Sequence, residues 1–165
     1  MTDDQLKRFT DAFEPAAKLA REAGFDGVDI KCCHRYLNSE LLSAYHREGR
    51  YGGSLENRTR LLRESVVGAR ELCSKDFLIA SRLNVYDGFP YPYGFGVAED
   101  GSLDFDSTEP IWLLRELKKT NPNIEKSIFQ GLHGVQLDTF PGFKYRGKDH
   151  SFLDYYHGAA EFGDT

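Results

Sequence analysis

Apolar residues recur at helical spacing over residues 2–24, which predicts an amphipathic helix at the start of the chain. Thr2 and Gln5 have the spacing of a capping box, and Gly24 stands where a glycine commonly ends a helix. Pro15 lies inside this run, and an internal proline predicts a kink or a break. The apolar positions are Leu6, Phe9, Phe13, Ala16, Ala17 and Ala20.

Two short apolar segments, Phe25–Ile30 and Phe77–Leu83, are predicted to be strands because they are too short for buried helices. A loop and a short helix are expected over Cys32–Arg50. One helix is then predicted over Ser54–Cys73 from a single apolar stripe. That stripe consists of Leu55, Leu62, Val66, Ala69 and Cys73.

A long loop, Asn84–Ser107, follows the second strand, and a third helix is predicted over Glu109–Lys118. The resulting order of helices and strands predicts parallel strands joined by helical crossovers. Two parallel strands do not complete a sheet, since parallel strands need several neighbours and two covered faces. Further along, Gly134–Phe140 reads as a strand and Ser151–Phe162 as a helix.

Composition narrows the class of protein. The chain has 165 residues, 40% of them hydrophobic, which is enough for one folded domain. A net charge of −5 argues against a nucleic-acid binder. No apolar run reaches the roughly 18 residues of a membrane span, and the N-terminus lacks the features of a secretory signal. Three cysteines make no disulfide framework, so we expect a reduced, cytoplasmic protein.

Three titratable residues, Lys31, His34 and Tyr36, follow directly after the first predicted strand. Enzymes with parallel strands commonly keep their chemistry at the carboxyl ends of those strands. Histidine and tyrosine can donate protons or hydrogen bonds there, and lysine adds a charge. The alternative is a loop whose polar side chains are merely solvated. Cys32 and Cys33 are adjacent, without the spacing of a zinc site, so buried packing is the favoured interpretation and no metal is expected.

Two other motifs carry candidate chemistry. Tyr51–Ser54 (YGGS) opens a helix and is either a phosphate cradle or, as we favour, a structural turn. Arg82 interrupts an apolar strand, and a buried arginine requires an anion, so a ligand contact is predicted. A salt bridge to Asp29 or Glu56 is the alternative. The aromatic loop Tyr86–Gly96 is either a lid over an apolar ligand or a packed loop.

Four segments together resemble the old yellow enzyme family of flavin-dependent oxidoreductases: Ala23–Ile30 (AGFDGVDI), Lys31–Tyr36 (KCCHRY), Tyr51–Arg60 (YGGSLENRTR) and Arg82. The resemblance covers residues 1–118 and implies an α/β fold, a partial TIM (β/α)8 barrel comprising about strands four to six with their helices. We expect residues 1–165 to form a single partial barrel domain, with 119–165 as an unassigned tail.

The resemblance also implies an activity. Family members reduce activated C=C bonds, in enones or dienoyl thioesters, with NAD(P)H through FMN. His34 corresponds to a residue that holds the carbonyl oxygen of a small unsaturated carbonyl substrate, and Lys31 replaces its usual histidine partner. Tyr36 corresponds to the proton donor. Arg82 corresponds to the arginine that contacts the flavin, whose reduced form is anionic.

Rival interpretations remain open at this point. A TIM barrel takes about 250 residues, so we expect the first three strands to be missing and the isolated chain to be inactive. Lys31 could instead form a Schiff base in a lyase or aldolase. The chain could also be a non-catalytic fragment or interaction module that self-associates through open strand edges.

Overall fold

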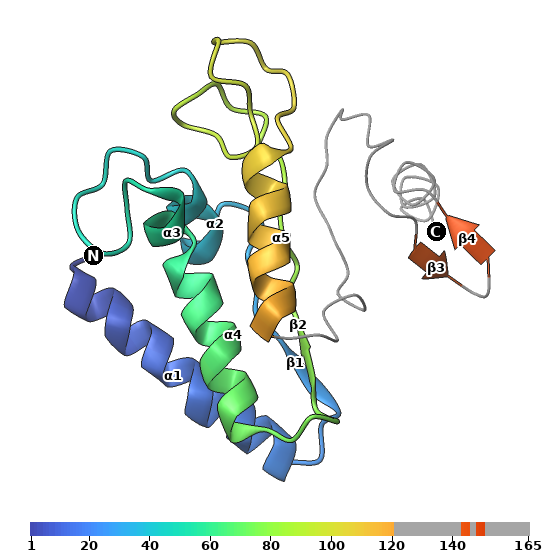
Figure 1. Ribbon diagram of the computed structural model, residues 1–165. Coiled ribbons are helices and arrows are strands. Elements are labelled where there is room, and N and C mark those ends of the chain that lie inside the picture. The colour runs from blue at the N-terminus through green and yellow to red at the C-terminus, as the bar shows by residue number, and fades with distance from the viewer. Residues whose placement is uncertain (121–142, 146–147, 151–165) are drawn as a thin grey trace, which may run out of the picture. The chain divides into compact units, whose positions relative to one another are not determined.

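The computed structural model describes residues 1–120, 143–145 and 148–150, which Figure 1 shows as coloured ribbon. The chain divides into two compact units, Met1–Gly131 and Leu132–Thr165. The first contains, in order, α1 (Asp3–Glu22), β1 (Gly27–Asp29), α2 (Leu37–Leu42), α3 (Leu55–Arg58), α4 (Arg60–Leu72), β2 (Leu78–Ala80) and α5 (Thr108–Thr120).

The second unit contains an antiparallel pair, β3 (Phe143–Tyr145) and β4 (Lys148–His150). The sequence pattern gave no prediction for this hairpin, because its polar and aromatic residues show no clear period. The strand predicted over Gly134–Phe140 and the helix predicted over Ser151–Phe162 lie outside the described residues.

β1 and β2 pair in parallel, with Gly27 opposite Leu78, which confirms the predicted crossover topology. Pairing continues past the strand ends, where the Cys32 amide donates to the Arg82 carbonyl at 2.8 Å. The carboxyl ends of both strands therefore reach the same edge of the sheet. Residues that follow β1 lie beside residues that follow β2, although they are far apart in sequence.

Both ends of α1 form as predicted. The Thr2 and Gln5 side chains make a reciprocal capping box. At the other end Gly24 adopts a φ of 86°, and the Phe25 amide donates to the Ala20 carbonyl, which satisfies the last turn. Of the kink or break predicted at Pro15, the break is wrong, since α1 runs through this residue, and the kink stays a prediction. Packing of one face of α1 along α4 holds the helix together despite the missing amide donor (Figure 1).

The single helix predicted over Ser54–Cys73 is also wrong, because the structure has two helices, α3 and α4, that meet at Thr59. The Thr59 hydroxyl is buried and donates to the Leu55 carbonyl at 2.7 Å. Such back-bonding by threonine bends helices. The predicted apolar stripe is confirmed for Leu62, Val66, Ala69 and Cys73, all buried.

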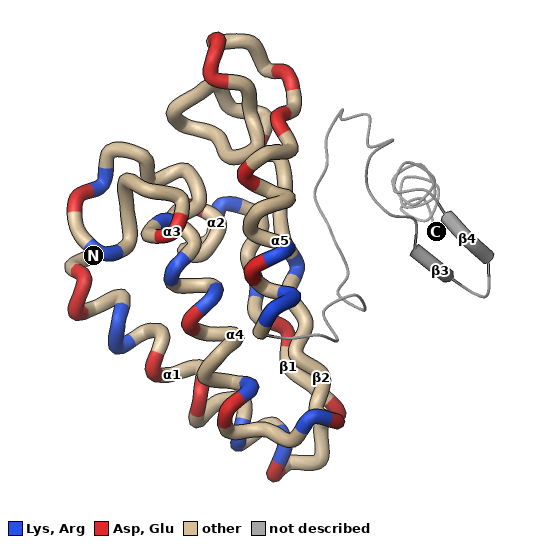
Figure 2. Tube along the Cα trace, in the orientation of Figure 1, with Lys and Arg blue, Asp and Glu red and all other residues tan. Residues whose placement is uncertain are grey.

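The core lies where α4 packs against α1, β2 and α5 (Figure 1). Its buried residues include Leu6 of α1, Ile79 of β2 and Leu113 of α5. The helix predicted over Glu109–Lys118 is thereby confirmed as α5. Charges of both signs alternate along the outer surfaces of α1 and α4 (Figure 2), as in the Lys18–Glu22 ion pair at 3.8 Å. Within the described residues, no helix is both long and apolar enough to cross a membrane.

Candidate active site

Lys31, His34 and Tyr36 lie at the carboxyl end of β1, as predicted. The Lys31 ammonium stands 3.5 Å from the centroid of the Tyr36 ring. This is a cation–π contact, which holds a positive charge against the face of a phenol. Tyr36 is 62% exposed and His34 is exposed, so both side chains are open to a small molecule. The structure thus brings Lys31 and Tyr36 into contact, with His34 on the same short turn.

The backbone of this turn is unusual. His34 and Arg35 have φ angles of 58° and 55°, the left-handed region that non-glycine residues rarely adopt. The turn ends at Tyr36, whose extended backbone precedes α2. On the inner side, the buried Asn38 side chain donates to the Lys31 carbonyl at 2.9 Å. Two consecutive strained residues persist only where surrounding contacts over-determine them.

Arg35 provides those contacts, although no pattern in the sequence marks it as a site residue. Its guanidinium lies 2.9 Å from the Asp87 carboxylate and 2.7 Å from that of Glu40. It also donates to the Tyr93 carbonyl at 3.2 Å. Glu40 is close in sequence, but Asp87 is separated by 52 residues, so no local signal pointed to that pair.

Asp87 is fully buried and anchors the aromatic loop. Its carboxylate accepts the Phe95 amide at 3.2 Å, and its own amide donates to the Phe95 carbonyl at 3.0 Å. Burial raises the pKa of the Asp87 carboxyl, while the Phe95 amide and Arg35 oppose that rise. Phe95 is buried, whereas Phe89 and Tyr93 are exposed. These contacts support the packed-loop interpretation, and the lid over an apolar ligand stays a prediction.

Arg82 is not buried, contrary to prediction. Its side chain is 38% exposed and pairs with Asp29, Nε to Oδ2 at 2.5 Å. The salt bridge offered as the alternative is therefore confirmed. Arg82 was predicted to be buried because the apolar strand around it was assumed to be covered on both faces. Ser81 and Leu83 are buried, whereas Arg82, between them, points to the other side of the chain.

The Tyr51–Ser54 segment forms the structural turn that the sequence favoured. At Gly52 a Cβ atom would lie 2.3 Å from the Arg47 carbonyl oxygen, and Gly53 has a φ of 78°. Ser54 then caps α3, accepting the Asn57 amide at 3.3 Å. Both glycines are therefore required by backbone geometry.

Arg58, in the same motif, is 3% exposed. It binds Glu109 of α5 and donates to the Leu42 and Gly53 carbonyls at 2.5 and 3.0 Å. Its guanidinium also lies 3.8 Å from the ring of Tyr45, whose hydroxyl donates to Glu109 at 3.0 Å. Burial, followed by the Glu109 charge, raises the pKa of Tyr45.

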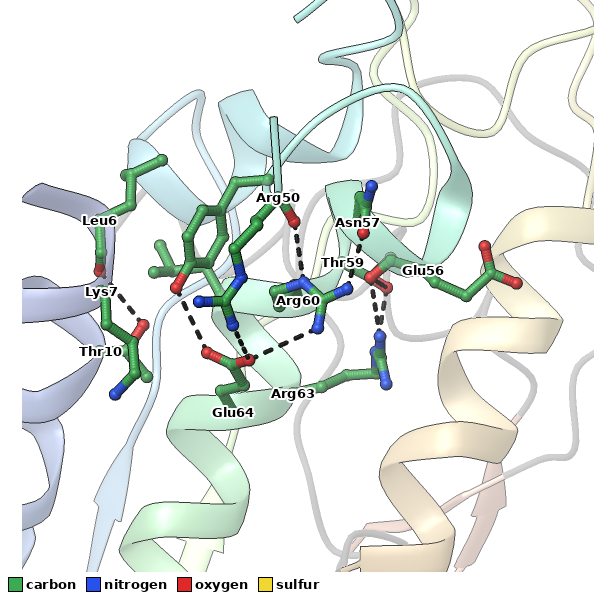
Figure 3. A network of polar contacts seen from close by, with 12 residues as sticks. Leu6, Lys7, Thr10, Arg50, Glu56, Asn57, Thr59, Arg60, Arg63 and Glu64 are labelled. Atoms are coloured by element: carbon green, nitrogen blue, oxygen red, sulfur yellow. Dashed lines mark hydrogen bonds and ion pairs between the residues drawn. The ribbon is translucent and has the colours of Figure 1, made fainter. Parts of the chain in front are cut away.

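A second polar network covers the start of α4 (Figure 3). Glu64 accepts the Tyr51 hydroxyl at 3.3 Å and pairs with Arg60 at 3.6 Å. Arg60 in turn donates to Asn57 at 2.7 Å. Tyr51 itself is buried in a cluster with Leu6, Leu41 and Leu61. The polar residues of this segment therefore link the turn and α3 to α4, and the buried ring of Tyr51 adds a contact with α1.

Cys32 and Cys33 are both buried, which confirms the packing interpretation. Burial raises the pKa of both thiols, most strongly that of Cys32. Across the described residues, no group of three or more histidine, cysteine, aspartate or glutamate side chains is arranged to hold a metal ion.

Parallel strands with crossover helices, and titratable side chains at the shared carboxyl edge, are the arrangement of α/β proteins, both barrels and open sheets. Residues 1–126 match the profile of a protein family described as the NADH:flavin oxidoreductase / NADH oxidase family. The chain belongs to this family.

Individual relatives agree with this assignment. The chain is 39% identical over 148 residues to an NADPH dehydrogenase of Clostridium acetobutylicum, covering 88% of this chain and 40% of that protein. It is 46% identical to an NADPH dehydrogenase of Bacillus subtilis, covering 87% of this chain and 39% of that one. The chain thus spans about two fifths of the length of these relatives.

Solved structures show the fold. Old Yellow Enzyme from Pichia sp. AKU4542 superposes with a TM-score of 0.59 at 33% identity, over 72% of this chain and 30% of that one. Morphinone reductase, at 23% identity and a TM-score of 0.58, shows the same fold. The first unit therefore has the α/β fold of a TIM-barrel segment.

Proposed function

We propose that this chain is part of an FMN-dependent oxidoreductase of the old yellow enzyme type, which reduces activated C=C bonds with NAD(P)H. The observation that carries the proposal is the contact of Lys31 with Tyr36 beside His34, at the carboxyl end of a barrel strand. Family membership and the NADPH dehydrogenase relatives support it. A 38% identical relative, over 52% of this chain, is a cinnamate reductase, whose name specifies an unsaturated acceptor.

Each of the three residues has a distinct role in this proposal. His34 and Lys31 donate hydrogen bonds to the carbonyl oxygen of the acceptor, which draws electrons from its double bond. Tyr36 donates its phenolic proton to the acceptor carbon. After this proton transfer a negative charge remains on the Tyr36 phenolate. The Lys31 ammonium, 3.5 Å from the ring centroid, stabilises that charge.

Arg82 fits the role of a flavin contact. Its side chain binds Asp29 through Nε, and within the described part of the chain no other side-chain bond engages its terminal nitrogens. These donors stand at the same strand edge as Lys31. FMN, when bound, supplies hydride to the acceptor after reduction by NAD(P)H. The positive charge of Arg82 would then stabilise the anionic reduced flavin ring.

The proposal extends to the placement of the chain within a barrel. We assign β1 and β2 to strands four and five of the barrel, and residues 119–165 stay an unassigned tail. The remaining strands would come from sequence outside residues 1–165 or from another chain that pairs with the open strand edges. We place the protein in the cytoplasm, because its three cysteines are unpaired.

Flavin titration and alkene reduction test the proposal. We expect the chain, supplemented with any barrel sequence encoded beside it, to bind FMN and to reduce cyclohexenone with NADPH. Tyr36→Phe should lower alkene reduction by about 10²–10⁴-fold, the usual contribution of a general acid. Reduction of FMN by NADPH should be unchanged in that variant, which is the internal control.

Two results would contradict the proposal. Absence of FMN binding in the barrel-completed protein would exclude the flavin chemistry. A Lys31 adduct trapped by borohydride with a carbonyl ligand would instead favour the Schiff-base alternative.

A further inference from the structure

We propose that Arg35 is a positioning residue, which fixes the His34–Tyr36 turn against the aromatic loop 86–95 and so aims both side chains at the acceptor. This inference rests on the proposed function. Arg35 stands between two candidate catalytic residues, yet its own guanidinium turns toward the aromatic loop. A residue with this arrangement acts through its neighbours rather than on the substrate.

The first observation is the backbone. A φ of 55° at Arg35, next to 58° at His34, lies in the left-handed region, which is strained for residues other than glycine. Because this conformation reverses the chain between Cys33 and Tyr36, it determines where the His34 and Tyr36 side chains emerge. Contacts that stabilise the conformation therefore control the geometry of the acceptor site.

The second observation is the burial of the partner. The Asp87 side chain is 0% exposed and lies 2.9 Å from the Arg35 guanidinium. A buried carboxylate without a cation is strongly unfavourable, so this pair ties the turn to the loop across 52 residues of sequence. Asp87 also accepts a hydrogen bond from the Phe95 amide, so the ion pair with Arg35 restrains the far end of the loop as well.

The third observation is that the same guanidinium holds the outer part of the loop. It donates to the Tyr93 carbonyl at 3.2 Å and lies 4.9 Å from the centroid of the Phe89 ring. Phe89, Tyr93 and Tyr36 are 48%, 66% and 62% exposed. Arg35 thus contacts the outer part of the loop at the Tyr93 backbone and at the Phe89 ring.

Hydrogen exchange on the full chain tests the restraint without requiring activity. Arg35→Gly removes the side chain at a φ that glycine adopts freely, so the turn is not newly strained. We expect amide exchange at Asp87 and Phe95 to accelerate at least about tenfold. Arg35→Lys, which keeps the charge without the planar fork, should lie between Arg35→Gly and the unaltered chain.

Arg47→Ala is the matched control, because Arg47 also lies in a loop and pairs with an aspartate, Asp3, at 2.7 Å. It should leave exchange at Asp87 and Phe95 unchanged. Unchanged exchange in Arg35→Gly would overturn the proposed restraint. Equal acceleration in Arg47→Ala would do so as well, since the effect would then be general loosening.

Kinetics separate positioning from simple stabilisation. In the FMN-loaded, barrel-completed protein, Arg35→Gly should lower kcat for cyclohexenone by about 10-fold or more. Reoxidation of reduced FMN by oxygen should be unaffected, because oxygen has no carbonyl group for His34 to hold and no alkene carbon for Tyr36 to protonate. Equal loss in both reactions would overturn the positioning role. If the barrel-completed protein reduces no alkene even without substitution, the proposed function and the positioning role are both contradicted. Hydrogen exchange at Asp87 and Phe95 would still show whether Arg35 restrains the turn against the loop.

Discussion

Arg58 and Glu109 form a two-pronged ion pair, with nitrogen–oxygen distances of 2.5 and 3.1 Å, across 51 residues of sequence. Arg58 belongs to the motif that most clearly resembles the old yellow enzymes, and Glu109 lies in the first turn of α5. The pair fixes the motif to the helix that follows the aromatic loop. The motif is therefore structural at this position.

Removal of Arg58 should destabilise the fold strongly. Arg58→Ala leaves Glu109 beside Tyr45 without its cation, and breaking a buried pair typically costs about 3–5 kcal/mol of unfolding free energy. Denaturant titration followed by circular dichroism would measure this loss. Arg60→Ala is the control, because its pair with Glu64 is partly exposed and should contribute below about 1 kcal/mol. Equal losses in the two variants would contradict the prediction.

Asp87 should give a distinctive pH dependence. Its folded-state pKa is raised above 3.8 by burial, so its stabilising contribution is complete below 3.8 and is lost as pH rises through the folded value. Asp87→Asn does not titrate, so its unfolding free energy relative to the unaltered chain should increase with pH across that window. Paired urea titrations from pH 3 upward, in steps of roughly half a unit, would follow the difference.

Asp100 provides the control of opposite sign. Hydrogen bonds from Ser102 lower the pKa of Asp100, so its contribution is present above 3.8 and is lost as pH falls through the folded value. Asp100→Asn should therefore lose stability relative to the unaltered chain as pH rises. The same slope in both variants would contradict the assignment of burial as the cause at Asp87.

Arg82 should matter more to flavin binding than to the fold. Its pair with Asp29 is 38% exposed on each side, so Arg82→Ala should change the unfolding free energy by less than about 1 kcal/mol. In a protein that binds FMN, the same variant should raise the Kd for FMN, measured by flavin fluorescence. Arg115→Ala, on the exposed side of α5, should leave the Kd unchanged. An unaltered Kd in Arg82→Ala would remove Arg82 from the flavin site.

The two adjacent cysteines should be unreactive in the folded protein. Cys32 and Cys33 are each 0% exposed, and burial raises the pKa of both thiols. Because the thiolate is the reacting species, modification by a disulfide reagent should be slow until the chain unfolds. Three thiols per chain should then react in denaturant. Rapid modification of Cys32 or Cys33 in the folded protein would show that this strand end is open.

Local sequence signals were sufficient for several features because the interactions are local. The Thr2–Gln5 capping box, the glycine that ends α1 and the turn at Gly52 and Gly53 all form between neighbouring residues. The two parallel strands and α5 followed from apolar spacing. Where local rules failed, at Pro15 and Thr59, tertiary packing or a buried hydroxyl determined the outcome.

The sequence by itself determined the family, the alternation of helices with the two parallel strands, and the presence of Lys31, His34 and Tyr36 at one strand end. Only the tertiary structure decided which charges pair: Arg58 with Glu109, Arg35 with Asp87 and Arg82 with Asp29, across 51, 52 and 53 residues. The physical reason is that an ion pair depends on distance in space and on burial. Neither quantity follows from residue type or local spacing.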